Sequence, residues 1–361
     1  MSRAVYLHVG APKTGTTYLQ DRLMLNAESL AAHGVTIPTK NRFVDADLFH
    51  FRAALDLLGQ DWGGDPGHAD GSWDSMVRRV RRAPGAAIIS HEILGAAKPD
   101  KIAKAMNDFA GCEVHVVYSA RDLGRQLPAA WQESIKQGRK WTFRRFLNKV
   151  ERGETWFQKA LDLPTVLNNW SVKLPPERVH VVTVPHDRGQ DELWQRFAEA
   201  FSIDPAWAPK DSERANRSLG IAETQLIRRL NRRLELSVRR EQTYDALIRE
   251  LLAQRELVSR ESVPVRLPPS RFEWADQQAD LWIDWVKGSG VHVVGDVDDL
   301  RPRRPPEGTQ WRDPDRVGAK LQLDAALDAL SVMTREAAAR PDPERALGYR
   351  IRENSKRLRR R

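Results

Sequence analysis

A short loop near the N-terminus carries the residues whose types and spacing best suit the binding of an anion. It reads Gly10-Ala11-Pro12-Lys13-Thr14-Gly15-Thr16-Thr17. A pattern typical of a buried strand precedes it, and apolar residues at helical spacing follow it. A strand that passes through such a loop into a helix presents unpaired backbone N–H groups and the positive end of the helix dipole to one point. We therefore predict that the loop binds a phosphate-like group.

The position of the lysine separates this loop from the one that binds nucleoside triphosphates. Gly10 and Gly15 have the spacing of that loop, but its lysine follows the last glycine directly, and Thr16 occupies this place here. Lys13 instead lies within the loop after Pro12, from where its ammonium can reach a bound phosphate. A P-loop kinase or nucleotidase is therefore a disfavoured alternative.

The elements that must position this loop alternate along the chain. Patterns typical of buried strands occur at residues 4–9, 86–90, 114–119, 179–184 and 291–294. Helical patterns separate them, which predicts an α/β fold of three layers, α/β/α, with helices on both faces of a central parallel sheet. Prolines interrupt regular structure at 302–306. We therefore place one α/β domain at residues 1–305 and a C-terminal extension at residues 306–361.

An arginine follows the third of these strands. Ligands of open parallel sheets collect at the carboxyl ends of the strands, where Arg121 is expected to lie. A guanidinium suits bidentate binding of phosphate, so Arg121 is a second candidate for anion binding. The alternative is a local ion pair with Asp122.

The loop resembles a motif of a known family. The residues Pro12-Lys13-Thr14-Gly15-Thr16-Thr17-Tyr18, directly after a first strand, resemble the 5′-phosphosulfate loop of sulfotransferases that use 3′-phosphoadenosine-5′-phosphosulfate. The likeness extends over most of residues 1–300 and implies the P-loop-like sulfotransferase architecture. It implies that Lys13 contacts the 5′-phosphate and the bridging oxygen. By the same resemblance Thr16 and Thr17 hold phosphate oxygens, and Tyr18 stacks on the adenine.

A second motif of that family binds the 3′-phosphate of the nucleotide. Residues 116–122 resemble its first half, with Arg121 as its arginine. The family has a serine eight residues later, and this chain has Ala129 there. Gln126, Gln132 and Ser134 are the nearby residues that could replace the missing hydroxyl.

The resemblance implies transfer of a sulfuryl group to a hydroxyl or amine acceptor by in-line displacement. In such a reaction the protein supplies positioning and charge stabilisation, and Lys13 would neutralise charge on the bridging oxygen. His91 and Glu92 end the second strand pattern and are the candidates for the base, of which we favour Glu92. A structural ion pair of Glu92 with Lys13 or Arg121 is the alternative. A nucleotide-binding protein without turnover remains the non-enzymatic alternative, with Ala129 as its clue.

Composition limits the cofactors, the partners and the compartment. Nine scattered histidines suggest no metal cluster, so we expect a nucleotide donor, a small-molecule or glycan acceptor and no metal. The absence of a signal-peptide layout and of an apolar run of about 18 residues predicts a cytoplasmic chain without a membrane span. The single cysteine, Cys112, fits a reducing compartment.

The net charge of +9 is concentrated at the C-terminus. Eight basic residues and one acid lie between Arg345 and Arg361, which leaves +2 for the rest of the chain. Nucleic-acid binding by the main domain is therefore not expected. We predict a solvated basic tail, separable from the fold, with an anionic partner such as nucleic acid or lipid headgroups as the alternative.

Overall fold

A six-stranded parallel β-sheet forms the centre of the computed structural model, which describes residues 4–39, 46–62, 64–187, 189, 191–212 and 218–340. Its strands are β1 (Ala4–His8), β2 (Val35–Thr36), β3 (Ala86–Ser90), β4 (Glu113–Ala120), β5 (Val179–Thr183) and β6 (His292–Val294). They lie in the order β2-β3-β1-β4-β5-β6, and every neighbouring pair is parallel. The predicted α/β class with a central parallel sheet is therefore confirmed. Of the strands in the described chain, the sequence patterns missed only the two-residue edge strand β2.

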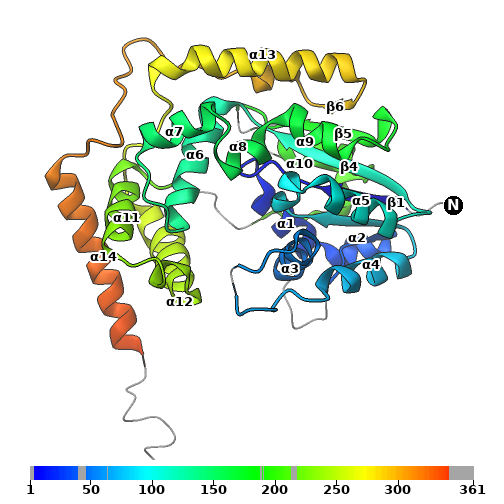
Figure 1. Cartoon of the computed structure of the whole chain (residues 1–361), viewed down its shortest axis with the longest axis horizontal. Helices are drawn as coiled ribbons and strands as arrows, with labels where there is room; N and C mark the ends of the chain where they lie inside the picture. The colour runs from blue at the N-terminus through cyan, green and yellow to red at the C-terminus, as the bar shows by residue number, and fades with distance from the viewer. Residues whose placement is uncertain are drawn as a thin grey trace, which may run out of the picture.

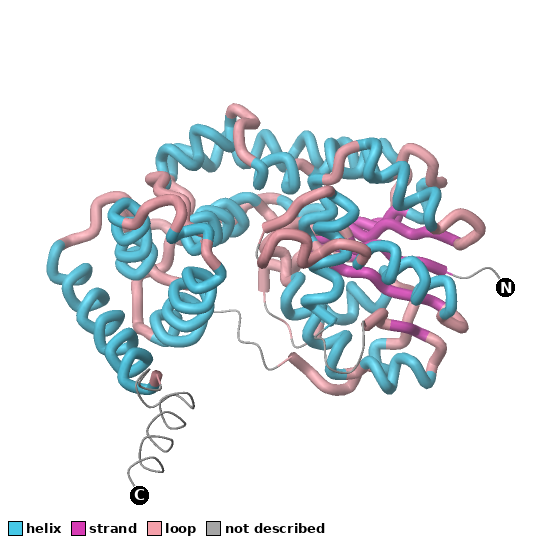
Figure 2. The backbone as a smooth tube through the Cα atoms, turned by 60° about the horizontal axis from the view of Figure 1, so that its bottom comes forward, coloured by secondary structure: helices cyan, strands magenta, loops and turns pink. Residues whose placement is uncertain are grey.

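Two apolar cores lie on opposite faces of the sheet, because successive side chains of a strand point to opposite sides. In β1, Val5 and Leu7 belong to one core and Tyr6 to the other. The first core is formed with α3 (Ala46–Leu58), α4 (Ser72–Arg82), α5 (Pro99–Asp108), α6 (Leu123–Lys136), α7 (Phe143–Glu151), α8 (Trp156–Leu161), α9 (Leu163–Trp170) and α13 (Phe272–Ser289). The second core is formed with α1 (Thr16–Leu25), α2 (Ala27–Ala32) and α10 (Glu192–Ala200). Helices thus cover both faces, as the three-layer prediction requires (Figures 1 and 2).

A group of helices lies beside one end of the sheet region and is called the helical lobe here (Figure 1). It consists of α11 (Ile221–Arg233), α12 (Gln242–Tyr244), the π-helix η5 (Asp245–Glu256) and α14 (Ala319–Ala339). In this lobe α11 packs against α6 and α14, and η5 packs against α14. The predicted extension at residues 306–361 therefore contains α14, while the basic tail falls in residues 341–361, outside the described residues.

Short 3₁₀ helices complete the structure. They are η1 (Glu92–Ala96), η2 (Pro176–Arg178), η3 (Pro205–Trp207), η4 (Val238–Arg240), η6 (Leu257–Ser259), η7 (Pro269–Arg271) and η8 (Val297–Leu300). In the described ranges no helix combines the length and the apolar character that a membrane span requires.

Several histidines are buried in the fold without a compensating charge. Burial lowers the pKa of His8 to about 3 and the pKa of His50 to about 4. Burial also lowers the pKa of His180 to about 4, with smaller contributions from His115 and His292. His180 lies 2.9 Å from each of these neighbours, measured between ring nitrogens, which links β4, β5 and β6 by imidazole hydrogen bonds. All three of the strongly shifted imidazoles are neutral at physiological pH.

We predict that the protein loses stability as the pH falls from about 7 to about 5. In the unfolded chain each imidazole has a pKa of 6.5, so the unfolded state takes up protons before the folded state does. The stability contributed by each neutral imidazole is therefore present above pH 6.5 and is lost as the pH falls toward the folded pKa. The expected loss is about 2 kcal/mol for each of the three groups at about pH 5. Urea unfolding across this pH range measures it.

The control is His50→Gln, which removes one titrating group and retains a side chain that can form hydrogen bonds. Its free energy of unfolding should depend less on pH, by the contribution of one imidazole. Equal pH dependence of the wild type and the variant would show that His50 is not neutral in the folded protein.

Candidate functional site

The loop between β1 and α1 is fixed on both sides by neighbouring strands. The Ala11 N–H donates to the Ser119 carbonyl over 2.8 Å, and the Ser119 N–H donates to the Gly10 carbonyl over 2.6 Å, which fastens the loop to β4. On the other side, a Cβ at Gly10 would lie 3.3 Å from the Glu92 carbonyl oxygen, and the φ of Gly10 is +124°. Glycine is therefore required where the loop passes the end of β3.

Side chains beneath the loop form a buried network of hydrogen bonds. The two ring nitrogens of His8 lie 2.7 Å from the Ser90 hydroxyl and 3.2 Å from the Ser119 hydroxyl. The Ser119 hydroxyl also donates to the Gly10 carbonyl over 2.9 Å. The Thr14 hydroxyl donates to the Ala11 carbonyl over 2.6 Å and contacts Ser119. Thr14 therefore stabilises the loop from beneath. The sign of this network in the sequence is His8, a histidine within an apolar strand pattern.

The first turn of α1 has neither a capping side chain nor an acidic residue. Gly15 precedes the helix with a φ of +97°. The Thr16 side chain is buried, with its hydroxyl 3.5 Å from the Ala11 carbonyl, whereas Thr17 is exposed. Tyr18 is half-buried and its hydroxyl accepts a hydrogen bond from Arg22 over 2.8 Å. The unpaired N–H groups of this turn and the helix dipole favour a negative ligand.

A buried carboxylate from α6, which the sequence analysis did not single out, is the partner of Lys13. Glu133 lies with one oxygen 2.6 Å from the Lys13 ammonium and 2.7 Å from the Lys136 ammonium, and its other oxygen lies 3.4 Å from Arg249 of η5. Burial alone would raise the pKa of Glu133, but Lys13, Lys136 and Arg249 together hold it well below its ordinary value. Glu133 is therefore ionised and neutralises cations from three separate parts of the chain.

Arg121 reaches the loop from the carboxyl end of β4. Its guanidinium donates to the Lys13 carbonyl over 3.0 Å. Of the three residues proposed to replace the missing serine, Gln126 also contacts the loop and donates to the Pro12 carbonyl over 2.8 Å. Gln132 instead bonds to the Leu219 carbonyl and the Thr224 hydroxyl, and Ser134 bonds within α6 to the Trp131 carbonyl. Gln126 is thus the one of the three that the structure places at the loop.

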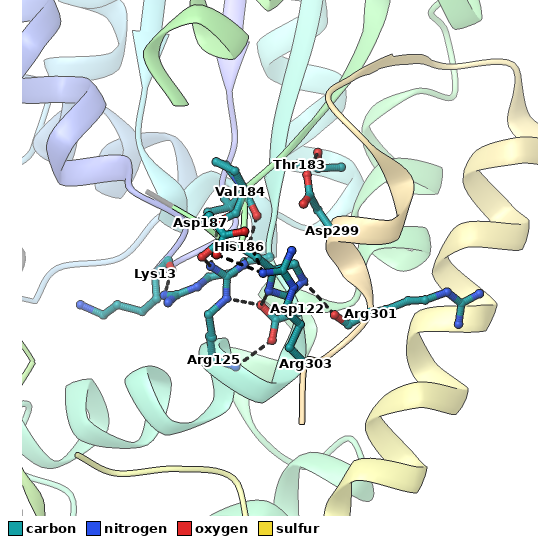
Figure 3. Close-up of polar contacts among 12 residues, drawn as sticks. Lys13, Asp122, Arg125, Thr183, Val184, His186, Asp187, Asp299, Arg301 and Arg303 are labelled. Carbon is teal, nitrogen blue, oxygen red and sulfur yellow. Dashed lines mark hydrogen bonds and ion pairs between the residues drawn. The ribbon is translucent and has the colours of Figure 1, made fainter. Parts of the chain in front are cut away.

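Asp122, the residue after Arg121, forms its ion pair with Arg125. Asp122 is buried, caps α6 by accepting from the Arg125 N–H over 3.0 Å, and forms an ion pair with the Arg125 guanidinium (Figure 3). That guanidinium also donates to the carbonyls of Val184 and Pro185, over 3.1 Å and 2.8 Å. Asp122 and Arg125 therefore join the ends of β4 and β5, while the Lys13 side chain points away from them (Figure 3).

His91 and Glu92 lie together at the end of β3, beside the loop. The His91 N–H donates to the His8 carbonyl, and Nδ1 of His91 accepts from the Ile93 N–H over 3.3 Å. Burial lowers the pKa of His91, Glu92 partly opposes the shift, and Arg249 adds to it. Arg249 thus lowers the pKa of both His91 and Glu133. Since Arg249 belongs to η5, the helical lobe contributes to the electrostatics of the site. Within the described residues, no group of three or more histidine, cysteine, aspartate or glutamate side chains is placed to hold a metal ion.

Comparisons with known proteins give a structural likeness without support from sequence. No protein-family model matches the chain, and no curated protein matches it. Among solved structures, a sulfotransferase from Alicyclobacillus acidocaldarius is similar, with 16% sequence identity and a TM-score of 0.38. The likeness covers 67% of this chain and 100% of that chain.

We predict that Glu133→Gln lowers the free energy of unfolding by about 3 kcal/mol at neutral pH, because it leaves three cations without their buried counter-charge. The contribution of Glu133 is present above its ordinary pKa of 4.5 and is lost as the pH falls below that value, since its folded pKa is depressed. Urea unfolding of the wild type and the variant at neutral pH measures the difference.

The control is Glu154→Gln, which removes a partly exposed carboxylate that contacts Lys149 and Arg152. Its effect on unfolding should be too small to resolve. Similar effects of the two substitutions would contradict a special role of the buried carboxylate.

Proposed function

We propose that this chain is a sulfotransferase that moves a sulfuryl group from 3′-phosphoadenosine-5′-phosphosulfate to a hydroxyl or amine acceptor. The observation that carries the proposal is the hydrogen bond from the Arg121 guanidinium to the Lys13 carbonyl. The donor and acceptor atoms lie 3.0 Å apart, although the two residues are separated by 108 positions in the sequence. This hydrogen bond supports binding of the 3′-phosphate by Arg121 and of the 5′-phosphosulfate by Lys13 and the loop. The resemblance of residues 12–18 to the family loop supports the same assignment.

The residues around the loop fit a nucleotide with several negative charges. The first turn of α1 offers backbone N–H groups, Thr17 offers an exposed hydroxyl, and Lys13 and Arg121 offer cations. The Nε of Arg249 is buried and has no hydrogen-bond partner among the described residues, which leaves one more donor near the site. We propose that Pro12, Thr14, Gly15 and Thr16 shape the loop and that Tyr18 packs against the adenine.

The reaction proposed is a single in-line displacement. The acceptor oxygen or nitrogen forms a bond to sulfur while the bond from sulfur to the bridging oxygen breaks, and the bridging oxygen keeps the electron pair. The Lys13 ammonium neutralises the charge that develops on that oxygen. Glu133 holds this ammonium at 2.6 Å in the structure, and we propose that donor binding draws the ammonium from Glu133 toward the bridging oxygen.

The proton of the acceptor passes to a base at the end of β3. We propose Glu92 for this role, with His91 as the alternative, since both lie beside the loop and His91 is neutral. The partner of Lys13 is Glu133, so a structural pair between Glu92 and Lys13 is not needed to place the lysine. Arg249 of the helical lobe lies 3.4 Å from Glu133 and contributes to the lowered pKa of His91, and we propose that this lobe helps to bind a small-molecule or glycan acceptor.

We predict that the purified protein binds 3′-phosphoadenosine-5′-phosphate at least about tenfold more tightly than ATP, without magnesium. The reason is that Arg121 provides a cation for the 3′-phosphate, which ATP lacks, while Thr16 occupies the place of the lysine of ATP-binding loops. Calorimetric titration with both nucleotides measures the preference, and Arg121→Gln should abolish it. Equal affinity for ATP, or a requirement for magnesium, would overturn the nucleotide assignment.

We predict that Lys13→Ala lowers turnover by about two to three orders of magnitude, as loss of one oxyanion donor does, with a smaller effect on nucleotide affinity. Glu92→Gln keeps the shape of the side chain and removes its ability to take up a proton. It should lower turnover by about two to four orders of magnitude and leave nucleotide binding intact. Labelled sulfate transfer over a panel of acceptors measures turnover, and calorimetry measures binding.

His91→Gln is the matched control for the base. Normal turnover by Glu92→Gln together with a large loss of turnover in His91→Gln would show that His91 is the base. If Glu92→Gln loses melting temperature and nucleotide affinity together, Glu92 is a structural anchor. Tight nucleotide binding by the wild type with no transfer to any acceptor class would favour a binding protein without turnover.

A further inference from the structure

The last helix of the described chain presents its leucines to solvent and its smaller residues to the protein. The buried residues of α14 are Gln322, Ala325, Ala329 and Val332. Its leucines are exposed by 43% (Leu321), 59% (Leu323), 53% (Leu327) and 63% (Leu330). The hydrophobic effect favours the opposite arrangement, and exposed apolar patches of this kind mark contact surfaces. Since α14 lies at the outer edge of the helical lobe, a partner can reach this face (Figure 1).

Three of these leucines form one continuous stripe. Leu323, Leu327 and Leu330 are separated by four and three residues, the spacing by which two α-helices pack along a shared seam. At about 100° per residue they fall within one sector of about 60° on the helix surface, whereas Leu321 lies about 120° away from Leu327. We call Leu323, Leu327 and Leu330 the leucine stripe.

We propose that the leucine stripe is a dimer interface, on which α14 packs antiparallel against α14 of a second copy of the chain. In the antiparallel register that aligns the two stripes, Leu327 of each copy faces Leu330 of the other, and Leu323 faces Thr334. Two-fold symmetric pairing buries the same patch on both copies, and it is the commonest arrangement of oligomers.

The charges beside the stripe favour this antiparallel pairing. The charged side chains nearest the stripe are Lys320 and Asp324, and both are exposed. In the antiparallel register Lys320 faces Ala337 and Asp324 faces Met333 of the other copy, so neither of these charges directly faces a like charge. A parallel pair would bring the two Lys320 side chains together, which is unfavourable.

The same charges argue against a membrane surface as the occupant. Helices that lie on membranes carry mainly lysine and arginine on the polar face. The charged residues nearest the leucine stripe are one lysine and one aspartate, Lys320 and Asp324, and Asp328, farther round the helix, forms an ion pair with Arg260 of the protein itself. A protein helix with leucines at matching positions fits this flank better than anionic lipid does.

Sedimentation equilibrium of the full chain tests the proposal. The wild type should form a dimer, and Leu327→Glu/Leu330→Glu should raise the dissociation constant at least about a hundredfold by placing carboxylates in the seam. The substituted side chains are more than half exposed, so circular dichroism should show an unchanged helical spectrum, which establishes that the variant folds. The matched control is Leu321→Glu, which changes an exposed leucine outside the stripe and should leave the dimer intact.

Cross-linking tests the orientation in a Cys112→Ser background. Leu323→Cys with Thr334→Cys should form disulfides between copies, whereas Leu323→Cys alone should not, because the two copies of residue 323 lie about 16 Å apart along the antiparallel axis. Cross-linking by Leu323→Cys alone would overturn the antiparallel register. A wild type that stays monomeric at high micromolar concentration, or a dimer unaffected by Leu327→Glu/Leu330→Glu, would overturn the interface. Neither result depends on the proposed transferase activity.

Discussion

One buried imidazole holds together the strand ends on which the whole site depends. His8 at the end of β1 lies within hydrogen-bonding distance of Ser90 in β3 and Ser119 in β4. Burial lowers its pKa to about 3, so the ring is neutral and can donate from one nitrogen while it accepts at the other. The Ser119 hydroxyl in turn donates to the Gly10 carbonyl, which fixes the start of the loop between β1 and α1. The positions of Lys13, Arg121 and Glu92 relative to one another follow from this arrangement.

A single buried carboxylate then sets the electrostatics of the site. Glu133 neutralises Lys13 from the loop, Lys136 from its own helix and Arg249 from the helical lobe. Burying an ionised carboxylate is unfavourable unless cations and hydrogen bonds surround it, as they do here. The same contacts connect the sheet region to the helical lobe. An anionic ligand that competes for Lys13 therefore changes the interaction between these two parts of the protein.

The strands and the loop could be predicted because their signals are local in sequence. Apolar runs marked five strands, and the glycines with Lys13 marked the turn into α1. Arg121 was placed near the loop by a general property of parallel sheets, and the contact with the Lys13 carbonyl agrees with that placement. The two-residue strand β2 was missed because two residues show no alternation.

The partners within the site could not be predicted, because they depend on tertiary contacts. Glu133 lies on a helix with ordinary amphipathic spacing and meets Lys13 across 120 residues of sequence. Arg249 comes from a π-helix that no local pattern predicts to approach the loop. The leucines of α14 are similarly uninformative in sequence, since leucines at helical spacing normally indicate a core. Their exposure becomes visible only when the neighbouring helices are in place.

The most direct test of the central claim is a crystal structure of the protein with 3′-phosphoadenosine-5′-phosphate. The account predicts the 5′-phosphate against the loop and the first turn of α1, in contact with Lys13, and the 3′-phosphate against Arg121. It also predicts that Lys13 has moved away from Glu133. A nucleotide bound elsewhere, or a loop that stays free of phosphate while Lys13 remains paired with Glu133, would contradict the account.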